Sequence, residues 1–286
     1  MTDIIGRAGP GDTYNVSMTT DIIHAERFYA EALHRLLASR IPFMIGGAYA
    51  LRHYAGIVRY TKDLDVFCTR RNRDRIVGLL SGFAGRVEAE NPTWIVKVYR
   101  GDLYIDVIYG SGNGICHVDE TWFDRSRPAR LLGSRVRLIP PEEMIWSKAF
   151  VQDRYRYDGA DIAHILCRQG RTLDWRRLLK RMDREWEILL AHLLNVRFIY
   201  PSARNIVPGW VLDELLAKLE HDRNRVHRGG PRPAPVCRGT LLTPHDYIED
   251  VTAWGYADAR ADIAREPRRE PRRDPRRAHH AHRRAG

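Results

Sequence analysis

A chain of 286 residues, 44% of them apolar, is long enough to form two domains of ordinary size with real hydrophobic cores. Its apolar runs stay short of the ~18 residues that a membrane-spanning helix needs, and its four cysteines are scattered singly, which excludes a C-x-x-C zinc site and indicates reduced thiols in a cytoplasmic protein. The formal net charge is +11, of which nine arginines and three acidic residues from Arg265 onward contribute +6, so the rest of the chain is moderately basic at +5.

The first half of the chain alternates helix and strand patterns. Residues 1–20 are rich in Gly, Ser, Thr and Asp, and we expect a loose lead-in there. From Asp21 an apolar stripe at helical spacing predicts a helix that Pro42 ends. The Gly101-Asp102 pair predicts a hairpin turn. Further helices are expected at 48–55 and from the N-cap Asn72 to 80, and strands at 43–45, 64–68, 86–90, 94–100, 103–109 and 131–139.

After Pro140-Pro141 the pattern changes to helix. Helices are expected at 142–152, 158–169, 174–199, 209–219 and 244–253, with a loop at 221–240. We therefore predict an α/β (α+β) protein, with a small mixed-sheet domain over 21–140 and a helical domain over 141–262. Residues 263–286 repeat arginine and proline with almost nothing to bury, which predicts a disordered basic tail. Such a tail is either an arm that binds nucleic acid or a solvated end.

Three aspartates stand in apolar strand patterns. Asp63 and Asp65 project to the same face of one strand, and Asp106 alternates with Ile105 and Val107 in another. Carboxylates gathered on one face are costly unless a cation lies between them, and their oxygens suit Mg²⁺. Three convergent carboxylates can hold two ions for in-line phosphoryl or nucleotidyl displacement. Asp63 and Asp65 would then bridge both ions, while Asp106 would bind the acceptor-side ion and take the proton of the acceptor hydroxyl.

A glycine turn precedes the first pair of aspartates. Gly46-Gly47 lies between a strand and a helix, where the backbone can approach a phosphate and the helix N-terminus presents unpaired N–H groups. Arg59 and Lys62 come just before the carboxylates and add positive charge for a triphosphate. The sequence thus predicts a nucleotide site beside the metal site.

The spacing of Gly46-Gly47, Asp63-x-Asp65 and a later strand aspartate resembles the nucleotidyltransferase superfamily, with its DNA-polymerase-β-like fold. Within that superfamily, which includes antibiotic adenylyltransferases, the motif is most similar to bacterial minimal and abortive-infection-type members. The resemblance covers about residues 43–166. It implies that Lys148 contacts the triphosphate and that Asp161 positions it. It also implies a toxin-like role, with an antitoxin-like protein as a partner.

The chain departs from the superfamily pattern at two places. Ala48 and Tyr49 follow the glycines where many members have a serine that contacts phosphate, so this contact would rest on backbone N–H groups or on Thr61. Tyr157-Asp158 replaces the usual lysine-aspartate pair, which leaves the role of Asp158 open.

The sequence therefore predicts a magnesium-dependent enzyme that transfers a nucleoside monophosphate from an NTP, such as ATP, to an acceptor and releases pyrophosphate. The acceptor can be RNA, a protein side chain or a small molecule, and the basic balance favours RNA. One alternative is a non-catalytic member of the same fold that senses nucleotide or binds a partner. Another is a nucleic-acid-binding module that depends on the arginine tail.

Overall fold

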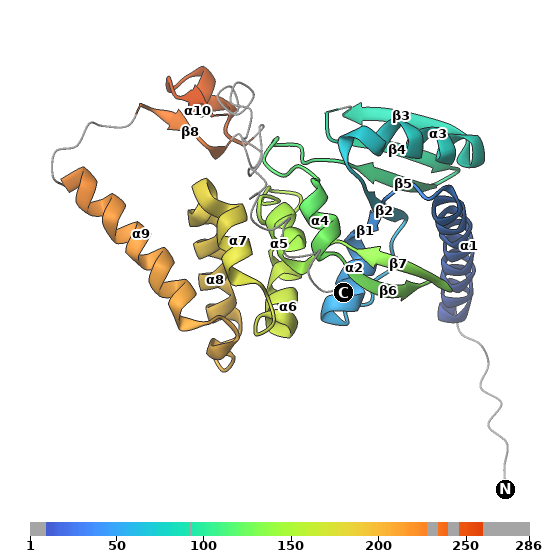
Figure 1. Cartoon of the computed structure of the whole chain (residues 1–286), viewed down its shortest axis with the longest axis horizontal. Coiled ribbons are helices and arrows are strands. Elements are labelled where there is room, and N and C mark those ends of the chain that lie inside the picture. The colour runs from blue at the N-terminus through green and yellow to red at the C-terminus, as the bar shows by residue number, and fades with distance from the viewer. Residues whose placement is uncertain (1–9, 92, 228–233, 240–245, 260–286) are drawn as a thin grey trace, which may run out of the picture.

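The computed structural model describes residues 10–91, 93–227, 234–239 and 246–259 (Figure 1). Its centre is a seven-stranded mixed sheet with the strand order β3-β4-β5-β2-β1-β7-β6. β2 runs parallel to β5 and β1 parallel to β7, whereas the other neighbouring strands are antiparallel. The strands are β1 (Met44–Ile45), β2 (Asp63–Phe67), β3 (Arg86–Asn91), β4 (Ile95–Arg100), β5 (Leu103–Ile108), β6 (Arg127–Leu131) and β7 (Ser134–Leu138).

Helices accompany the sheet and make up most of the described residues that follow it. Figure 1 shows α5 to α9 gathered on one side of the sheet region, and α6 packs against α2 and α5. The expected α/β class is confirmed, and the proposed domain division near residue 140 falls between β7 and α5. The helices are α1 (Pro10–Ser39), α2 (Gly47–Ala55), α3 (Arg73–Ala84), α4 (Glu120–Arg125), α5 (Pro141–Ala149), α6 (Gly159–Gln169), α7 (Trp175–Met182), α8 (Trp186–Ile199), α9 (Gly209–His227) and α10 (Ile248–Thr252).

The two central strands are anchored by fully buried apolar side chains. Leu64 and Val66 on β2, and Ile105 and Val107 on β5, are all 0% exposed. In a strand these residues alternate with their neighbours, so they hold Asp63, Asp65 and Asp106 against the opposite face. This burial fixes the register between the two strands, because a slip of one residue would turn the aspartates into the core.

Two expectations for the sheet half were wrong. The first helix begins at Pro10 and not at Asp21, and proline is well suited to the first helical position because it needs no N–H acceptor. The single strand expected at 131–139 is a hairpin of β6 and β7 instead. Leu132 and Gly133 both have positive φ, of 46° and 79°, which allows a two-residue turn. Asn72 does precede α3, but its side chain makes no capping hydrogen bond.

The helical half also differs from the expectation at three places. The helix expected at 174–199 breaks near Asp183, where φ is 8°. Apolar residues continue at helical spacing across this break, so periodicity alone could not reveal it. Residues 221–227 belong to α9 and not to a loop. Of the helix expected at 244–253, only Ile248–Thr252 is helical within the described residues.

Two short strands, β8 (Val236–Cys237) and β9 (Ala257–Asp258), pair in parallel beside α10. The predicted tail at 263–286 and the first nine residues of the predicted lead-in lie outside the described residues. Within the described part of the chain, no helix combines the length and the apolar character that crossing a membrane requires.

Candidate metal and nucleotide site

The three aspartates predicted as metal ligands lie together at the centre of the sheet. Asp65 on β2 stands directly beside Asp106 on β5 in the parallel register, and Asp63 precedes Asp65 by two residues on the same face. One carboxylate oxygen from each of the three lies within 4.8 Å of the others. We call Asp63, Asp65 and Asp106 the carboxylate triad.

The triad concentrates negative charge in a poorly solvated place. Asp106 is only 6% exposed. Burial raises the pKa of Asp65 to about 7, and the neighbouring charges of Asp63 and Asp106 act in the same direction. A cation bound between the carboxylates would relieve this repulsion. Three carboxylates that share a face, with room for water and phosphate oxygens, are a donor set that fits Mg²⁺.

The two glycines of the turn are required by close contacts with β2. Gly47 has φ of +53°, and a Cβ atom added there would lie 1.5 Å from Oδ2 of Asp65. A Cβ atom on Gly46 would lie 2.3 Å from the ring of Phe67. The backbone N–H of Gly46 donates to the carbonyl of Asp65 at 3.0 Å, which ties the turn to the triad strand. The N-terminus of α2 therefore approaches the carboxylates as closely as a backbone can.

A cavity of about 510 Å³ connects the triad with this helix N-terminus. Gly47 and Ala48 line it, and the first-turn N–H groups of α2 have no acceptor within the helix. Four cationic side chains also line the cavity, namely Arg59, Lys97, Lys148 and Arg156. The cavity thus offers carboxylates for a metal ion together with N–H groups and cations for phosphates.

Lys148 and Asp161, which the resemblance places at the triphosphate, are in contact in the structure. The Lys148 ammonium lies 2.8 Å from Asp161 and 2.6 Å from Asp158. The Arg59 guanidinium donates two hydrogen bonds to Asp161, at 3.0 and 2.9 Å. Asp158, whose role the sequence left open, therefore helps Asp161 to hold Lys148. We call these four residues the cleft network.

The cleft network joins the sheet half of the chain to α5 and α6. Burial raises the pKa of Asp161, but its contacts with Lys148 and Arg59 outweigh burial and hold that pKa below the ordinary value. Asp161 does not line the cavity; it acts on the cavity through the two cations that it holds.

Thr61 and Lys62 lie differently from each other although they are adjacent. The Thr61 hydroxyl donates to the Asp63 carboxylate and lines the cavity. Lys62 is exposed and does not line the cavity, because side chains on an extended segment alternate between faces. The expectation that Lys62 adds charge for a triphosphate finds no support in this geometry.

Two cations that line the cavity, Lys97 and Arg156, were not predicted from the sequence. Lys97 on β4 stands opposite Asp106 on β5, and its ammonium donates to both Asp106 oxygens at 2.9 and 3.2 Å. Counting outward from the predicted Gly101-Asp102 turn would have paired these residues, because a two-residue hairpin turn fixes the register. Arg156 lies in the segment between α5 and α6, and no pattern in the sequence marks it as a cavity residue.

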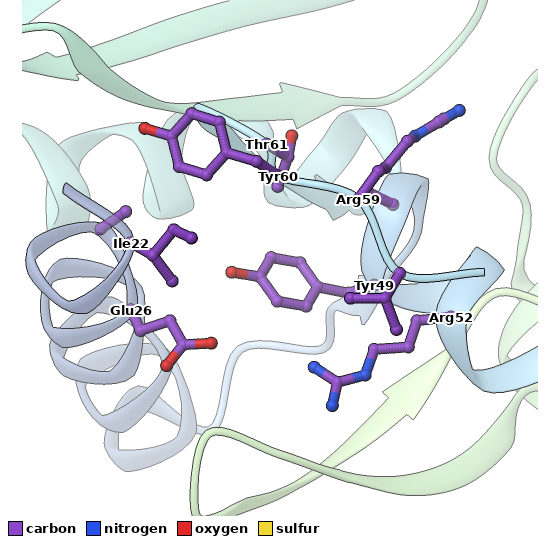
Figure 2. A pocket seen from close by; sticks show the side chains of 10 residues that line it. Ile22, Glu26, Tyr49, Arg52, Arg59, Tyr60 and Thr61 are labelled. Carbon is purple, nitrogen blue, oxygen red and sulfur yellow. The ribbon is translucent and has the colours of Figure 1, made fainter. Parts of the chain in front are cut away.

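A second, smaller pocket of about 110 Å³ adjoins the cavity between α1, α2 and residues 58–61 (Figure 2). Ala48, Arg59 and Thr61 line both hollows. Figure 2 shows the Glu26 carboxylate and the Arg52 guanidinium pointing toward each other across this pocket. The sequence did not predict it, because its walls come from segments that share no motif.

No family model and no curated protein matches the sequence. Solved structures show similarity of fold. ANT(2'')-Ia in complex with adenylyl-2''-tobramycin matches at 17% identity and a TM-score of 0.39, over 64% of this chain and 99% of that chain. The lincomycin-bound lincosamide antibiotic adenylyltransferase LnuA matches at 12% and 0.36, over 49% and 94%. An antigenic nucleotidyltransferase-like protein from Paracoccidioides brasiliensis matches at 17% and 0.35, over 64% and 93%.

LnuA is named as an adenylyltransferase and the P. brasiliensis protein as nucleotidyltransferase-like. Because the TM-scores are all under 0.5, we infer the function of this chain from its own residues.

Proposed function

We propose that the chain is a metal-dependent nucleotidyltransferase that moves a nucleoside monophosphate from an NTP to an acceptor and releases pyrophosphate. The observation that carries this proposal is the carboxylate triad in contact with the glycine turn that opens α2. A cluster of acids or a glycine turn is common on its own in proteins that bind no nucleotide. Their contact, however, joins a divalent-ion site to a phosphate site.

Asp63 and Asp65 would hold Mg²⁺, which when bound polarises the α-phosphate and neutralises charge that builds up during transfer. Asp106, beside them on β5, would accept the proton of the acceptor hydroxyl. The acceptor oxygen then bonds to the α-phosphorus, and the bond from that phosphorus to the bridging oxygen of pyrophosphate breaks. The Thr61 hydroxyl donates to Asp63 and fixes the direction of that carboxylate.

Phosphate binding would draw on α2 and on the cleft network. The N–H groups at the start of α2 would receive phosphate oxygens, and Lys148 would turn from Asp158 toward the β- and γ-phosphates. Asp161 would keep hold of Lys148 and Arg59 and so orient both cations. Such a role would explain why Asp158 and Asp161 lie around Arg59 and Lys148 in a cavity that is proposed to bind phosphate.

The acceptor stays open among RNA, protein and a small molecule, with RNA favoured by the chain's positive charge. The toxin-like role and the antitoxin-like partner stay predictions from the sequence resemblance. The chief rival is a non-catalytic protein that binds nucleotide through the same cavity. Against it stands the triad itself, because three adjacent carboxylates that share a single lysine repel one another unless a further cation is bound.

Incubation of the purified chain with Mg²⁺ and each NTP labelled at the α-phosphate, with total RNA, protein or metabolites as acceptor, tests the proposal. We expect label in one acceptor fraction, and none with Asp63→Asn. Nucleotide binding without transfer to any fraction would favour the non-catalytic rival.

A further inference from the structure

Lys97 is held against the carboxylate triad by close contacts and is not a mobile surface lysine. Besides its two hydrogen bonds to Asp106, its ammonium lies 4.4 Å from the centre of the Tyr104 ring. Only 18% of the Lys97 side chain and 9% of the Asp106 side chain are exposed. Separating a buried ion pair leaves each charge uncompensated, so the pair should persist when substrates bind.

Before a nucleotide binds, the charges around the triad leave a balance that one divalent ion neutralises. When all three carboxylates are ionised they carry three negative charges, and the Lys97 ammonium offsets one of them. In the cleft network, Arg59 and Lys148 are matched by Asp158 and Asp161, so this set adds no net charge. Arg156 is 69% exposed and lies 3.5 Å from Asp158, on the solvent side of that network.

The hydrogen bonds of Asp106 also favour a single divalent ion. Both oxygens of this carboxylate already receive hydrogen bonds from the Lys97 ammonium. A second divalent ion bound to Asp106 would therefore lie next to a positive charge, and like charges so close repel strongly. Asp63 and Asp65 have no such lysine among the ion pairs of the described residues.

We propose that Lys97 takes the place of the acceptor-side metal ion. The site then binds one divalent ion, at Asp63 and Asp65, while the Asp106–Lys97 pair receives the acceptor. This inference rests on the proposed function. It replaces the two-ion site predicted from the carboxylates alone by a site with one ion and the Lys97 ammonium.

In this arrangement the Lys97 ammonium contributes a positive charge and N–H donors to the transfer. Its ammonium lines the cavity and can donate a hydrogen bond to the acceptor oxygen or to a non-bridging oxygen of the α-phosphate. Asp106 accepts the acceptor's proton, the acceptor oxygen bonds to the α-phosphorus, and pyrophosphate leaves with the bridging oxygen. Lys97 thus holds Asp106 in place and supplies positive charge where a second ion would otherwise do so.

The test counts Mn²⁺ ions by electron paramagnetic resonance in complexes of the chain with the α,β-methylene analogues of ATP, GTP, CTP and UTP, each tested separately. We expect one Mn²⁺ per chain, with the spectrum of an isolated ion. Two Mn²⁺ per chain with an exchange-coupled spectrum would overturn the inference and leave the proposed function standing. No bound Mn²⁺ together with no NTP-dependent transfer would overturn both.

Three variants sharpen the result. Lys97→Met should open a second Mn²⁺ position and give the coupled spectrum, whereas Lys97→Arg should keep one ion because the charge is retained. Lys218→Met, which removes the same charge from α9, is the matched control and should leave the spectrum unchanged. If Lys97→Met does not fold, the ion count of the unaltered chain and of Lys97→Arg still decides the question. A single ion in a folded Lys97→Met variant would contradict the proposal.

Discussion

Replacing Gly47 by alanine tests the contact between the helix N-terminus and the triad, and Gly56 supplies a matched control on the same helix. Both glycines have positive φ, +53° and +73°, so alanine strains the backbone at either position. At Gly56 nothing lies within 4 Å of the added Cβ atom, whereas at Gly47 it would lie 1.5 Å from Oδ2 of Asp65 and 2.5 Å from its Cγ. The difference between the variants therefore isolates the collision with Asp65.

The expected loss of unfolding free energy follows from the backbone strain at both positions and from the collision with Asp65 at Gly47 alone. An alanine with positive φ costs about 1–2 kcal/mol of folding free energy. The smaller conformational freedom of the unfolded chain offsets a few tenths to about 1 kcal/mol of this cost, so Gly56→Ala should lower the free energy of unfolding by about 1 kcal/mol. In a protein of this size that is roughly 2–4 °C in melting temperature. Gly47→Ala adds the overpacking of a displaced carboxylate, typically about 1–3 kcal/mol, for a total of about 2–4 kcal/mol.

Urea unfolding and Mn²⁺ titration of both variants provide the assay. We expect Gly56→Ala to bind Mn²⁺ like the unaltered chain, and Gly47→Ala to bind it at least tenfold more weakly, which is about 1.4 kcal/mol. Equal Mn²⁺ affinity and equal stability in the two variants would refute the reasoning that the turn and the triad form one site.

Three further predictions concern the charged groups. Asp106→Asn should lower transfer far more than NTP binding, because Asp106 faces the acceptor; equal losses in an equilibrium binding assay and a turnover assay would contradict this division of labour. Lys148→Ala should weaken NTP binding by roughly 1.5–3 kcal/mol with partial rescue in Lys148→Arg, and unchanged affinity by calorimetry would remove α5 from the nucleotide site. The pKa of Asp161 is held below its ordinary 3.8, so its contribution to stability is present above about pH 4 and is lost as the pH falls through the lower folded pKa. Asp161→Asn should therefore remove part of the loss of unfolding free energy that urea unfolding detects as the pH falls below about 4, and an unchanged dependence on pH in that range would argue against it.

The triad was predictable because each of its parts is local. Alternation in a strand places Asp63 and Asp65 on one face, and apolar neighbours mark Asp106 as a buried position. The same alternation, applied one residue further, predicts that the Lys62 side chain faces away from those of Asp63 and Asp65. What the sequence could not supply was the strand order, because only the parallel pairing of β2 with β5 brings Asp65 beside Asp106.

Contacts between segments that are distant in the chain could not be predicted from the sequence. Arg59 and Asp161 are separated by 102 positions, and their hydrogen bonds depend on how α6 packs against α2. The break at Asp183 was hidden for a different reason, because the apolar stripe of α7 continues in phase into α8. Periodicity reports which face is buried and not where the backbone turns.

The most direct measurement of the central claim uses NTPs labelled at either the α- or the γ-phosphate. With the acceptor fraction identified, the account predicts that the α-label becomes attached to the acceptor, that the γ-label leaves as pyrophosphate, and that Asp63→Asn abolishes both. Attachment of the γ-label to the acceptor would show phosphoryl transfer instead of nucleotidyl transfer. Attachment of the α-label that persists in Asp63→Asn would show that the carboxylate triad is not the centre of the reaction.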